Sequence, residues 1–205
     1  MKRAIDHFQS NMLRVKELSG IRGAITNIVV APLDLSDILR AEFVLAVSAF
    51  DNFVHEVTRF GMLEIYESKR PTSDAYLRFQ LPLVCVNQIR LDPTVTSLVD
   101  AEIQLKHSYL SFQMPDKVAD AIRLVSDVKL WEEVSLKLGV SAQNAKEHLK
   151  LIVDRRNRIA HEADTSPVQT PPLYLYVRYP ISETDVAEAI GFLEQVAQAI
   201  YDVIV

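Results

Sequence analysis

An arginine, an asparagine and a histidine, Arg156, Asn157 and His161, form the most chemically informative cluster in this 205-residue sequence. A guanidinium keeps its proton and binds phosphate or carboxylate oxygens, whereas an imidazole exchanges a proton near neutral pH. Together they can stabilise charge on a phosphoryl group and move a proton at a neighbouring oxygen. The spacing Arg-Asn-x-x-x-His therefore indicates acid–base chemistry or phosphate binding.

The cluster lies in a helix that we predict within residues 141–164, starting at the N-cap candidate Ser141 directly after Gly139. Helical periodicity places six apolar residues on one stripe, namely Leu149, Ile152, Val153, Ile159, Ala160 and Ala163. Arg156 falls in the middle of this stripe. A guanidinium on a buried face needs a carboxylate, a phosphate or a water-filled cleft, so we expect a partner for Arg156.

A second long helix, predicted for residues 34–69, has a face that carries Arg40, Asp51 and His55. Arg40 and Asp51 are about three turns apart and so share that face. Two arrangements are open: these three groups pair with each other or with water, or Asp51 holds Arg156 across a helix–helix contact. Two weaker candidates for holding Arg156 lie on the same helix, Glu42 and Glu56.

The other elements are also mainly helical, because helix formers dominate and the chain has only five glycines. We predict an all-α antiparallel bundle in a single domain over residues 1–205, with a short extended segment near 173–179. The further helices are expected at 3–30, 74–80, after Asp92-Pro93, at 115–125, at 126–138 and after Ser182. Residues 83–87 fit a strand or a buried turn.

The net charge of −5 gives no general attraction to nucleic acid, so any such contact has to come from a local basic patch. The segment 146–158 is such a patch, and its candidates for RNA binding are Lys146, Lys150, Arg155 and Arg158. The simpler interpretation is a solvated helix face.

The single cysteine, Cys85, excludes an intrachain disulfide and favours a reducing compartment. No stretch approaches the roughly 18 apolar residues of a membrane span, and no signal peptide develops at the N-terminus. We therefore expect a cytoplasmic protein without membrane contact. The spacing of cysteines and histidines predicts no metal site, and we expect no cofactor.

The motif Arg156-Asn157-x-x-x-His161 near the end of a late helix resembles the R-x4-6-H motif of the HEPN superfamily. The segment from Arg40 to Asp51 is similar to a second signature of the RiboL-PSP-like HEPN branch, in which an arginine begins a long helix and an acid follows about three turns later. The resemblance covers most of the chain and leaves residues 70–138 as an insertion.

The resemblance implies a helical bundle that forms a homodimer, with the arginine and histidine of both protomers in a cleft at the interface. It further implies a metal-independent endoribonuclease, often a toxin of toxin–antitoxin or anti-phage systems, with RNA as substrate and an antitoxin as protein partner. Arg156 and His161 would be catalytic and Asn157 would orient them. Asp51, Arg40 and His55 would support the site. The products would be a 2′,3′-cyclic phosphate and a 5′-hydroxyl.

The positions of Arg156 and His161 on the predicted helix leave two alternatives to this function open. On an ideal helix, Arg156 and His161 lie about 140° apart, so they converge only if the helix bends or ends near Ala160, or if a dimer combines groups from two chains. The first alternative is a non-catalytic dimeric module that binds nucleotides or a protein. The second is that both residues only end a helix, where His161 meets the C-terminal dipole.

Overall fold

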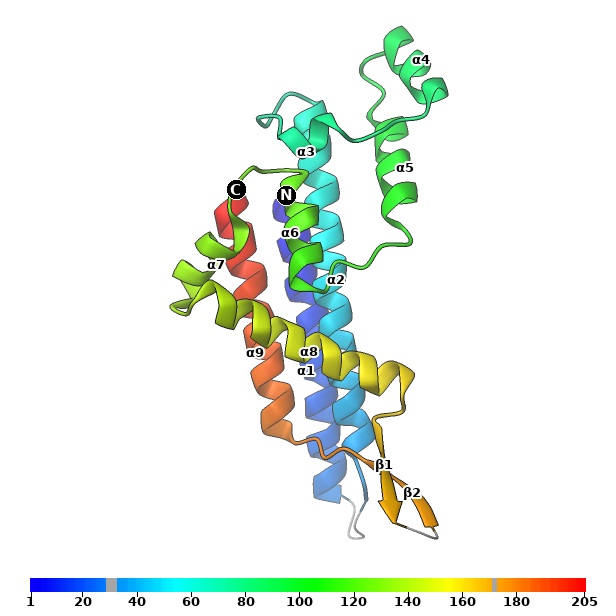
Figure 1. The fold of residues 1–205 in the computed structure, drawn as a ribbon, viewed down its shortest axis with the longest axis vertical. Coiled ribbons are helices and arrows are strands. Elements are labelled where there is room, and N and C mark those ends of the chain that lie inside the picture. The colour runs from blue at the N-terminus through cyan, green and yellow to red at the C-terminus, as the bar shows by residue number, and fades with distance from the viewer. Residues whose placement is uncertain (29–32, 171–172) are drawn as a thin grey trace.

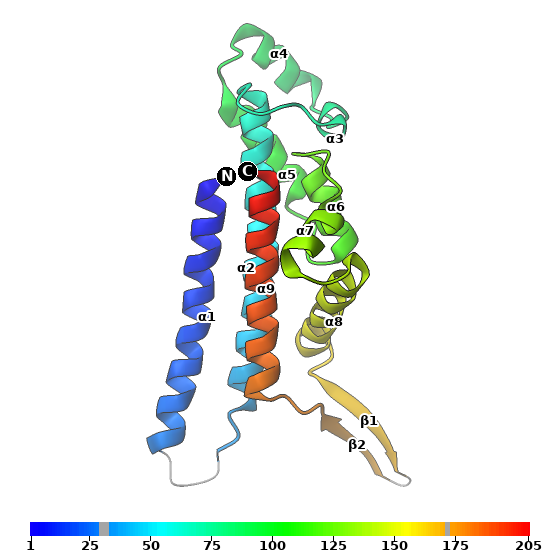
Figure 2. The same ribbon diagram turned by 90° about the vertical axis from the view of Figure 1, so that its left-hand side faces the viewer.

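The computed structural model describes residues 1–28, 33–170 and 173–205, and three long helices form its centre. α1 (Lys2–Ile28), α2 (Ser36–Tyr66) and α9 (Glu183–Ile204) lie side by side, with α2 and α9 running opposite to α1 (Figures 1 and 2). Apolar residues at helical spacing meet between them, and the largest of these fully buried side chains are Phe8, Met12, Phe50, Phe53, Leu193 and Ile200. The predicted all-α bundle is confirmed.

Both long N-terminal helices agree with the prediction to within a few residues. α1 continues through Gly20 and Gly23, because a lone glycine weakens a helix without breaking it. The last two residues of the predicted helix at 3–30 lie outside the described part of the chain. α2 is the longest helix and buries a broad face that includes Phe43, Val47 and Val57.

α8 (Ala142–His161) crosses the long helices and reaches past α2 at its C-terminal end (Figure 1). It is preceded by α6 (Pro115–Arg123) and α7 (Leu130–Leu138), which are joined by a hydrogen bond from Trp131 Nε1 to the carbonyl of Pro115 at 2.9 Å. Gly139 ends α7 in the left-handed region with φ +67°, as its position in the sequence predicts.

Three helices form an arm that extends from one end of the bundle: α3 (Asp74–Leu77), α4 (Leu83–Leu91) and α5 (Thr96–His107) (Figure 1). The prediction of a strand or buried turn at 83–87 was wrong, because this segment is the start of α4. Among the described residues no strand lies beside it, and a helix buries Cys85 on one face. Arg59 on α2 holds α5 through Asp100, with Nη2 to Oδ2 at 2.6 Å.

A hairpin of β1 (Thr165–Thr170) and β2 (Leu173–Arg178) follows α8 and projects from the other end of the bundle (Figure 2). The strands pair antiparallel from Thr165 opposite Arg178 to Thr170 opposite Leu173. The extended segment predicted near 173–179 is therefore confirmed, whereas β1 was not predicted because Pro167 argues against a strand. None of the described helices combines the length and apolar character that crossing a membrane requires.

Candidate active site

The helix that carries the motif begins as the sequence predicts but has a shorter apolar stripe. Ser141 caps α8 by accepting a hydrogen bond from the backbone N–H of Asn144 at 3.0 Å. The buried residues of α8 are Ala145, Leu149, Ile152 and Val153. Ile159 is only half-buried and Ala160 is exposed. The stripe stops being buried because the last turns of α8 extend past α2 (Figure 1).

Arg156 lies where burial gives way to solvent, and its guanidinium is incompletely paired. Its Nη1 donates to the side-chain oxygen of the adjacent Asn157 at 3.1 Å. Its Nε is buried and has no hydrogen-bond partner among the described residues. A buried cationic donor without an acceptor is costly, so an anionic oxygen that reached this nitrogen would stabilise it.

The expected contact between Asp51 and Arg156 is not formed in the described part of the chain, and this alternative was wrong. Asp51 instead accepts hydrogen bonds from the backbone N–H of Phe112 at 2.6 Å and from the amide of Gln113 at 3.0 Å. Its carboxylate also lies 3.9 Å from Nε2 of His55. Asp51 therefore holds the segment between α5 and α6 against α2.

The two weaker candidates also have other partners. Glu42 is buried and accepts a hydrogen bond from the hydroxyl of Ser19 at 2.7 Å. A carboxylate oxygen of Glu56 lies 2.9 Å from Nδ1 of His7. None of the three acids considered for Arg156 is therefore available to it.

Arg40 pairs with an acid that the sequence analysis did not single out, Asp164. Nε of Arg40 donates to Oδ2 of Asp164 at 2.9 Å, and Nη2 donates to the carbonyl of Tyr179 at 2.9 Å. Asp164 is completely buried and, like Ala163, has a positive φ, of 55°. Because non-glycine residues rarely adopt this conformation, the turn after α8 is held in place by these contacts.

Arg155 belongs to the same cluster, so its expected role in an RNA-facing patch is corrected. Its Nη2 donates to Oδ2 of Asp164 at 2.8 Å and to the carbonyl of Pro180 at 3.0 Å. Its guanidinium also lies over the ring of Tyr179. Burial lowers the pKa of Arg155 from its usual value, although the carboxylate of Asp164 opposes this.

The three remaining basic candidates on α8, Lys146, Lys150 and Arg158, lie in two different surroundings. Lys150 is exposed and Lys146 half-buried, and both line a cavity of about 290 Å³ beside the start of α6. Arg158 lies over the ring of Tyr179, with its guanidinium carbon 5.1 Å from the centroid. At about 100° per residue, Lys146, Lys150, Asn157 and His161 lie within roughly 60° of one another on α8. The two lysines therefore share the face of the histidine.

His161 is the last residue of α8 and is exposed. The helix stays regular through it, and the following N–H groups of Glu162 and Asp164 both bond to the carbonyl of Arg158. Because α8 neither bends nor ends before His161, the angular separation of about 140° from Arg156 remains within one chain. Within a single protomer, the side chains of Arg156 and His161 therefore point in different directions from the helix.

A second histidine site was missed because its partners come from three separate elements. His107 is buried, with its ring 6.4 Å from that of His55 and 5.4 Å from that of Phe112. Burial, followed by the nearby His55, lowers the pKa of His107 to about 4. His107 is therefore neutral at physiological pH.

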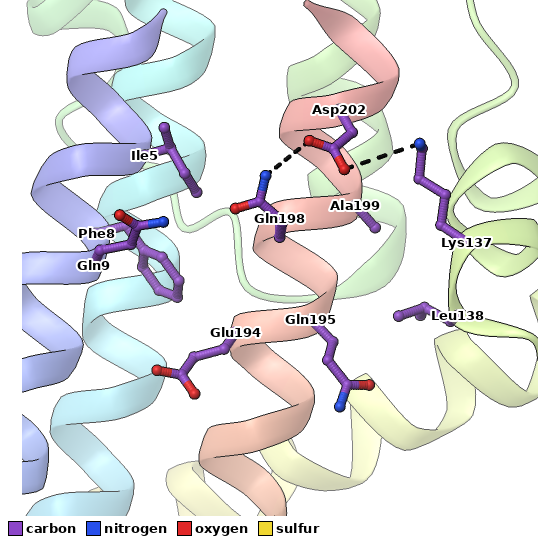
Figure 3. Close-up of a pocket in the computed structure, with 10 residues that line it drawn as sticks. All are labelled: Ile5, Phe8, Gln9, Lys137, Leu138, Glu194, Gln195, Gln198, Ala199 and Asp202. Carbon is purple, nitrogen blue, oxygen red and sulfur yellow. Dashed lines mark hydrogen bonds and ion pairs between the residues drawn. The ribbon is translucent and has the colours of Figure 1, made fainter.

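A larger cavity, of about 700 Å³, is lined by residues of α1, α7 and α9 (Figure 3). Its polar side chains include Gln198, which donates to Asp202 at 2.8 Å, and Lys137, which lies 3.9 Å from Asp202. It contains none of the predicted site residues. Among the described residues, no group of three or more histidines, cysteines or acids is arranged to hold a metal ion.

Comparison with known proteins adds one finding. No curated protein and no solved structure matches the chain. The model of one family, described as RiboL-PSP-HEPN, matches residues 13–205, which include both the segment from Arg40 to Asp51 and the motif on α8. Because this match covers nearly the whole chain, the protein belongs to the RiboL-PSP-HEPN family.

Proposed function

We propose that this protein is a metal-independent endoribonuclease that acts as a homodimer, with Arg156, Asn157 and His161 in its active site. The observation that carries the proposal is the incompletely paired guanidinium of Arg156, whose buried Nε has no acceptor among the described residues. A phosphodiester oxygen would satisfy this donor and its charge. Membership of a HEPN family, in which many members cleave RNA, supports the same assignment.

The proposed reaction is an attack of the ribose 2′-hydroxyl on the adjacent phosphorus. The 2′-oxygen loses its proton as the new P–O bond forms, and the bond to the 5′-oxygen breaks as that oxygen gains a proton. His161 transfers one of these protons, because an imidazole can accept a proton at one ring nitrogen and donate one from the other. Arg156 stabilises the negative charge of the phosphorane-like transition state, and Asn157 orients Arg156 through their hydrogen bond.

The dimer is part of the proposal because one chain does not bring the two groups together. Arg156 and His161 point in directions about 140° apart on a helix that is regular through His161. A two-fold axis near the end of α8 would place Arg156 of one protomer beside His161 of the other. Lys146 and Lys150, on the same face as His161, would then bind the RNA backbone on either side.

Purified protein incubated with RNA in the presence of EDTA tests the proposal. We expect fragments with 2′,3′-cyclic phosphate and 5′-hydroxyl ends. His161→Ala should lower the rate by about 10²–10⁴-fold, the usual contribution of an acid–base group. A control variant, His148→Ala on the same helix, should cleave normally. If RNA stays intact with the unaltered protein, or if the His161 variant cleaves equally well, the ribonuclease assignment is wrong.

A non-catalytic binding module is the second candidate, and one observation favours it. The imidazole of His161 is exposed and has no hydrogen bond to a described residue that would orient it. Such a module would bind RNA or a nucleotide without cleaving it, and the binding would weaken in Arg156→Gln.

In a cell, we propose a role as a toxin or anti-phage effector that an antitoxin protein restrains. Overexpression should then arrest growth, and His161→Ala should restore it. Growth arrest that persists in this variant would contradict a toxic ribonuclease. Normal growth with the unaltered protein, together with RNA binding in solution, would favour the binding module.

A further inference from the structure

A cavity of about 270 Å³ lies between α2 and α5, outside the proposed active site. Asn52 and His55 on α2 line one side, and Gln104 and His107 on α5, with Ser108 directly after it, line the other. Ile103 adds a fully buried apolar surface. The volume is slightly below the roughly 300–1,000 Å³ of sites for drug-sized ligands, so the cavity suits a single small molecule.

His107 is the unusual group of this cavity. Its residue surface is 94% buried, because only 6% remains exposed, and its ring is surrounded edge-on by the rings of His55, Phe79 and Phe112. The described residues offer its ring nitrogens no hydrogen bond. A buried imidazole that faces a cavity without a partner has capacity for one donor and one acceptor.

The charged side chains at the cavity, Arg59 and Glu56, already have polar partners. Arg59 forms a two-point ion pair with Asp100, in which Nη2 lies 2.6 Å from Oδ2. Glu56 is 2.9 Å from the ring nitrogen of His7. An anion would find no available cation here, and a cation would find no carboxylate without a partner. The ligand that fits best is therefore neutral.

The uncharged polar groups indicate the shape of that ligand. The amide of Asn52 presents a donor beside an acceptor, which is the pattern that amide side chains use to bind the edge of a nucleobase. Gln104 donates one N–H to Oδ2 of Asp100 at 3.1 Å and keeps its second N–H and its carbonyl oxygen. The ring of His55 lines the cavity and provides an aromatic surface there, with the buried ring of Phe112 packed against it at 4.4 Å between centroids. We propose that this cavity binds a neutral heteroaromatic ring of nucleobase size.

Titration of the full-length protein with adenosine, cytidine and uridine tests this proposal by NMR of the histidine ring resonances. We expect saturable binding of at least one nucleoside with a Kd of about 1 mM or tighter, and shifts of the His55 and His107 resonances. His107→Phe keeps an aromatic ring against Phe112 but removes both nitrogens, and it should weaken binding at least about tenfold.

Asn52→Leu provides a second variant, because it removes an amide of similar size without altering the aromatic cluster. It should weaken binding to a similar extent. His148→Phe, which replaces an imidazole against Phe192 on distant elements, should leave binding unchanged. The proposal is overturned if no nucleoside binds saturably, if both cavity variants bind as tightly as the unaltered protein, or if inorganic phosphate competes for the same resonances with equal affinity.

Arg156, Asn157 and His161 do not line this cavity, and the titration does not measure RNA cleavage. A negative result would therefore remove the second site and leave the ribonuclease proposal intact. Conversely, if this protein binds a nucleoside but does not cleave RNA, the proposal for the cavity is supported and the ribonuclease proposal is not.

Discussion

Nε of Arg40, in the second turn of α2, donates to the buried carboxylate of Asp164 at 2.9 Å, across 124 positions of the sequence. This contact joins the start of the longest helix to the turn that follows the motif helix. Arg155 binds the same oxygen from α8, so one carboxylate oxygen serves two guanidinium groups. The arrangement holds the end of α8, and with it His161, against the bundle.

Removing the carboxylate of Asp164 should therefore destabilise the protein strongly. We expect Asp164→Ala to lower the free energy of unfolding by about 3–5 kcal/mol, because two partly buried guanidinium groups lose their common partner. Urea denaturation measures the change. Asp37→Ala is the matched control: Asp37 is an exposed acid 3.7 Å from the same Arg40, and its loss should cost less than about 1 kcal/mol. Equal effects of the two substitutions would contradict a structural role for Asp164.

Substitution by glutamine should affect different properties of the protein at two consecutive arginines of α8: stability at Arg155 and RNA cleavage at Arg156. Arg155→Gln should lower the free energy of unfolding by about 2 kcal/mol or more, because it breaks the pair with Asp164. Arg156→Gln should change stability by less than about 1 kcal/mol, because no described acid pairs with it. If the proposed function is correct, Arg156→Gln should also slow RNA cleavage by about 10²-fold or more. The two readouts are urea denaturation and the initial rate of cleavage.

If Arg156→Gln lowers stability and Arg155→Gln slows cleavage without lowering stability, Arg156 is the structural residue and Arg155 the functional one. Circular dichroism of both variants serves as the control for intact helices. Unfolding of Arg155→Gln would also abolish cleavage. If cleavage returns when this variant is measured well below its unfolding temperature, the result agrees with a structural role for Arg155.

His107 should make the protein less stable in mild acid. Its pKa falls from 6.5 to about 4 in the folded chain, whereas the unfolded chain keeps the ordinary value. Between these values the unfolded state binds a proton that the folded state does not, so the free energy of unfolding falls as the pH drops from 6.5 to about 4. The loss is at most about 3 kcal/mol.

Comparison of His107→Phe with the unaltered protein at pH 7 and pH 4.5 checks this expectation. The variant should lose less stability than the unaltered protein between the two conditions, whereas His148→Phe should behave like the unaltered protein. Identical pH dependence in all three proteins would show that His107 is not the group responsible.

Two glycines in helices should tolerate alanine very differently. A Cβ at Gly61 in α2 would lie 2.6 Å from Val125 Cγ1 and 2.9 Å from its Cβ, so we expect Gly61→Ala to destabilise the fold by about 1–3 kcal/mol. A Cβ at Gly23 in α1 would meet no atom within 4 Å, and Gly23→Ala should stabilise the helix by up to about 1 kcal/mol. Thermal unfolding of both variants separates the two cases, and destabilisation by Gly23→Ala would contradict the open surroundings of that residue.

Short-range interactions set several helix ends of this protein, and the sequence predicts these ends. Gly139 and Ser141 mark the end of α7 and the start of α8, as predicted. The helix predicted after Ser182 starts with a capping box, in which Ser182 and Asp185 form reciprocal hydrogen bonds of 2.9 and 3.1 Å. These features involve residues at most a few positions apart, so the local sequence is sufficient to predict them. The same holds for the apolar faces of α2 and α9, which follow from a period of about 3.6 residues.

The sequence alone determined the long helices, the starts of α8 and α9 and the family-like motif on α8, because each of these depends on neighbouring residues. Only the tertiary structure decided the partners of the charged groups: Asp164 for Arg40 and Arg155, the segment at Phe112 and Gln113 for Asp51, and no described acid for Arg156. The physical reason is that a buried charge is satisfied by whichever polar group the packing of distant helices brings within about 3 Å, and spacing along the chain does not specify that group.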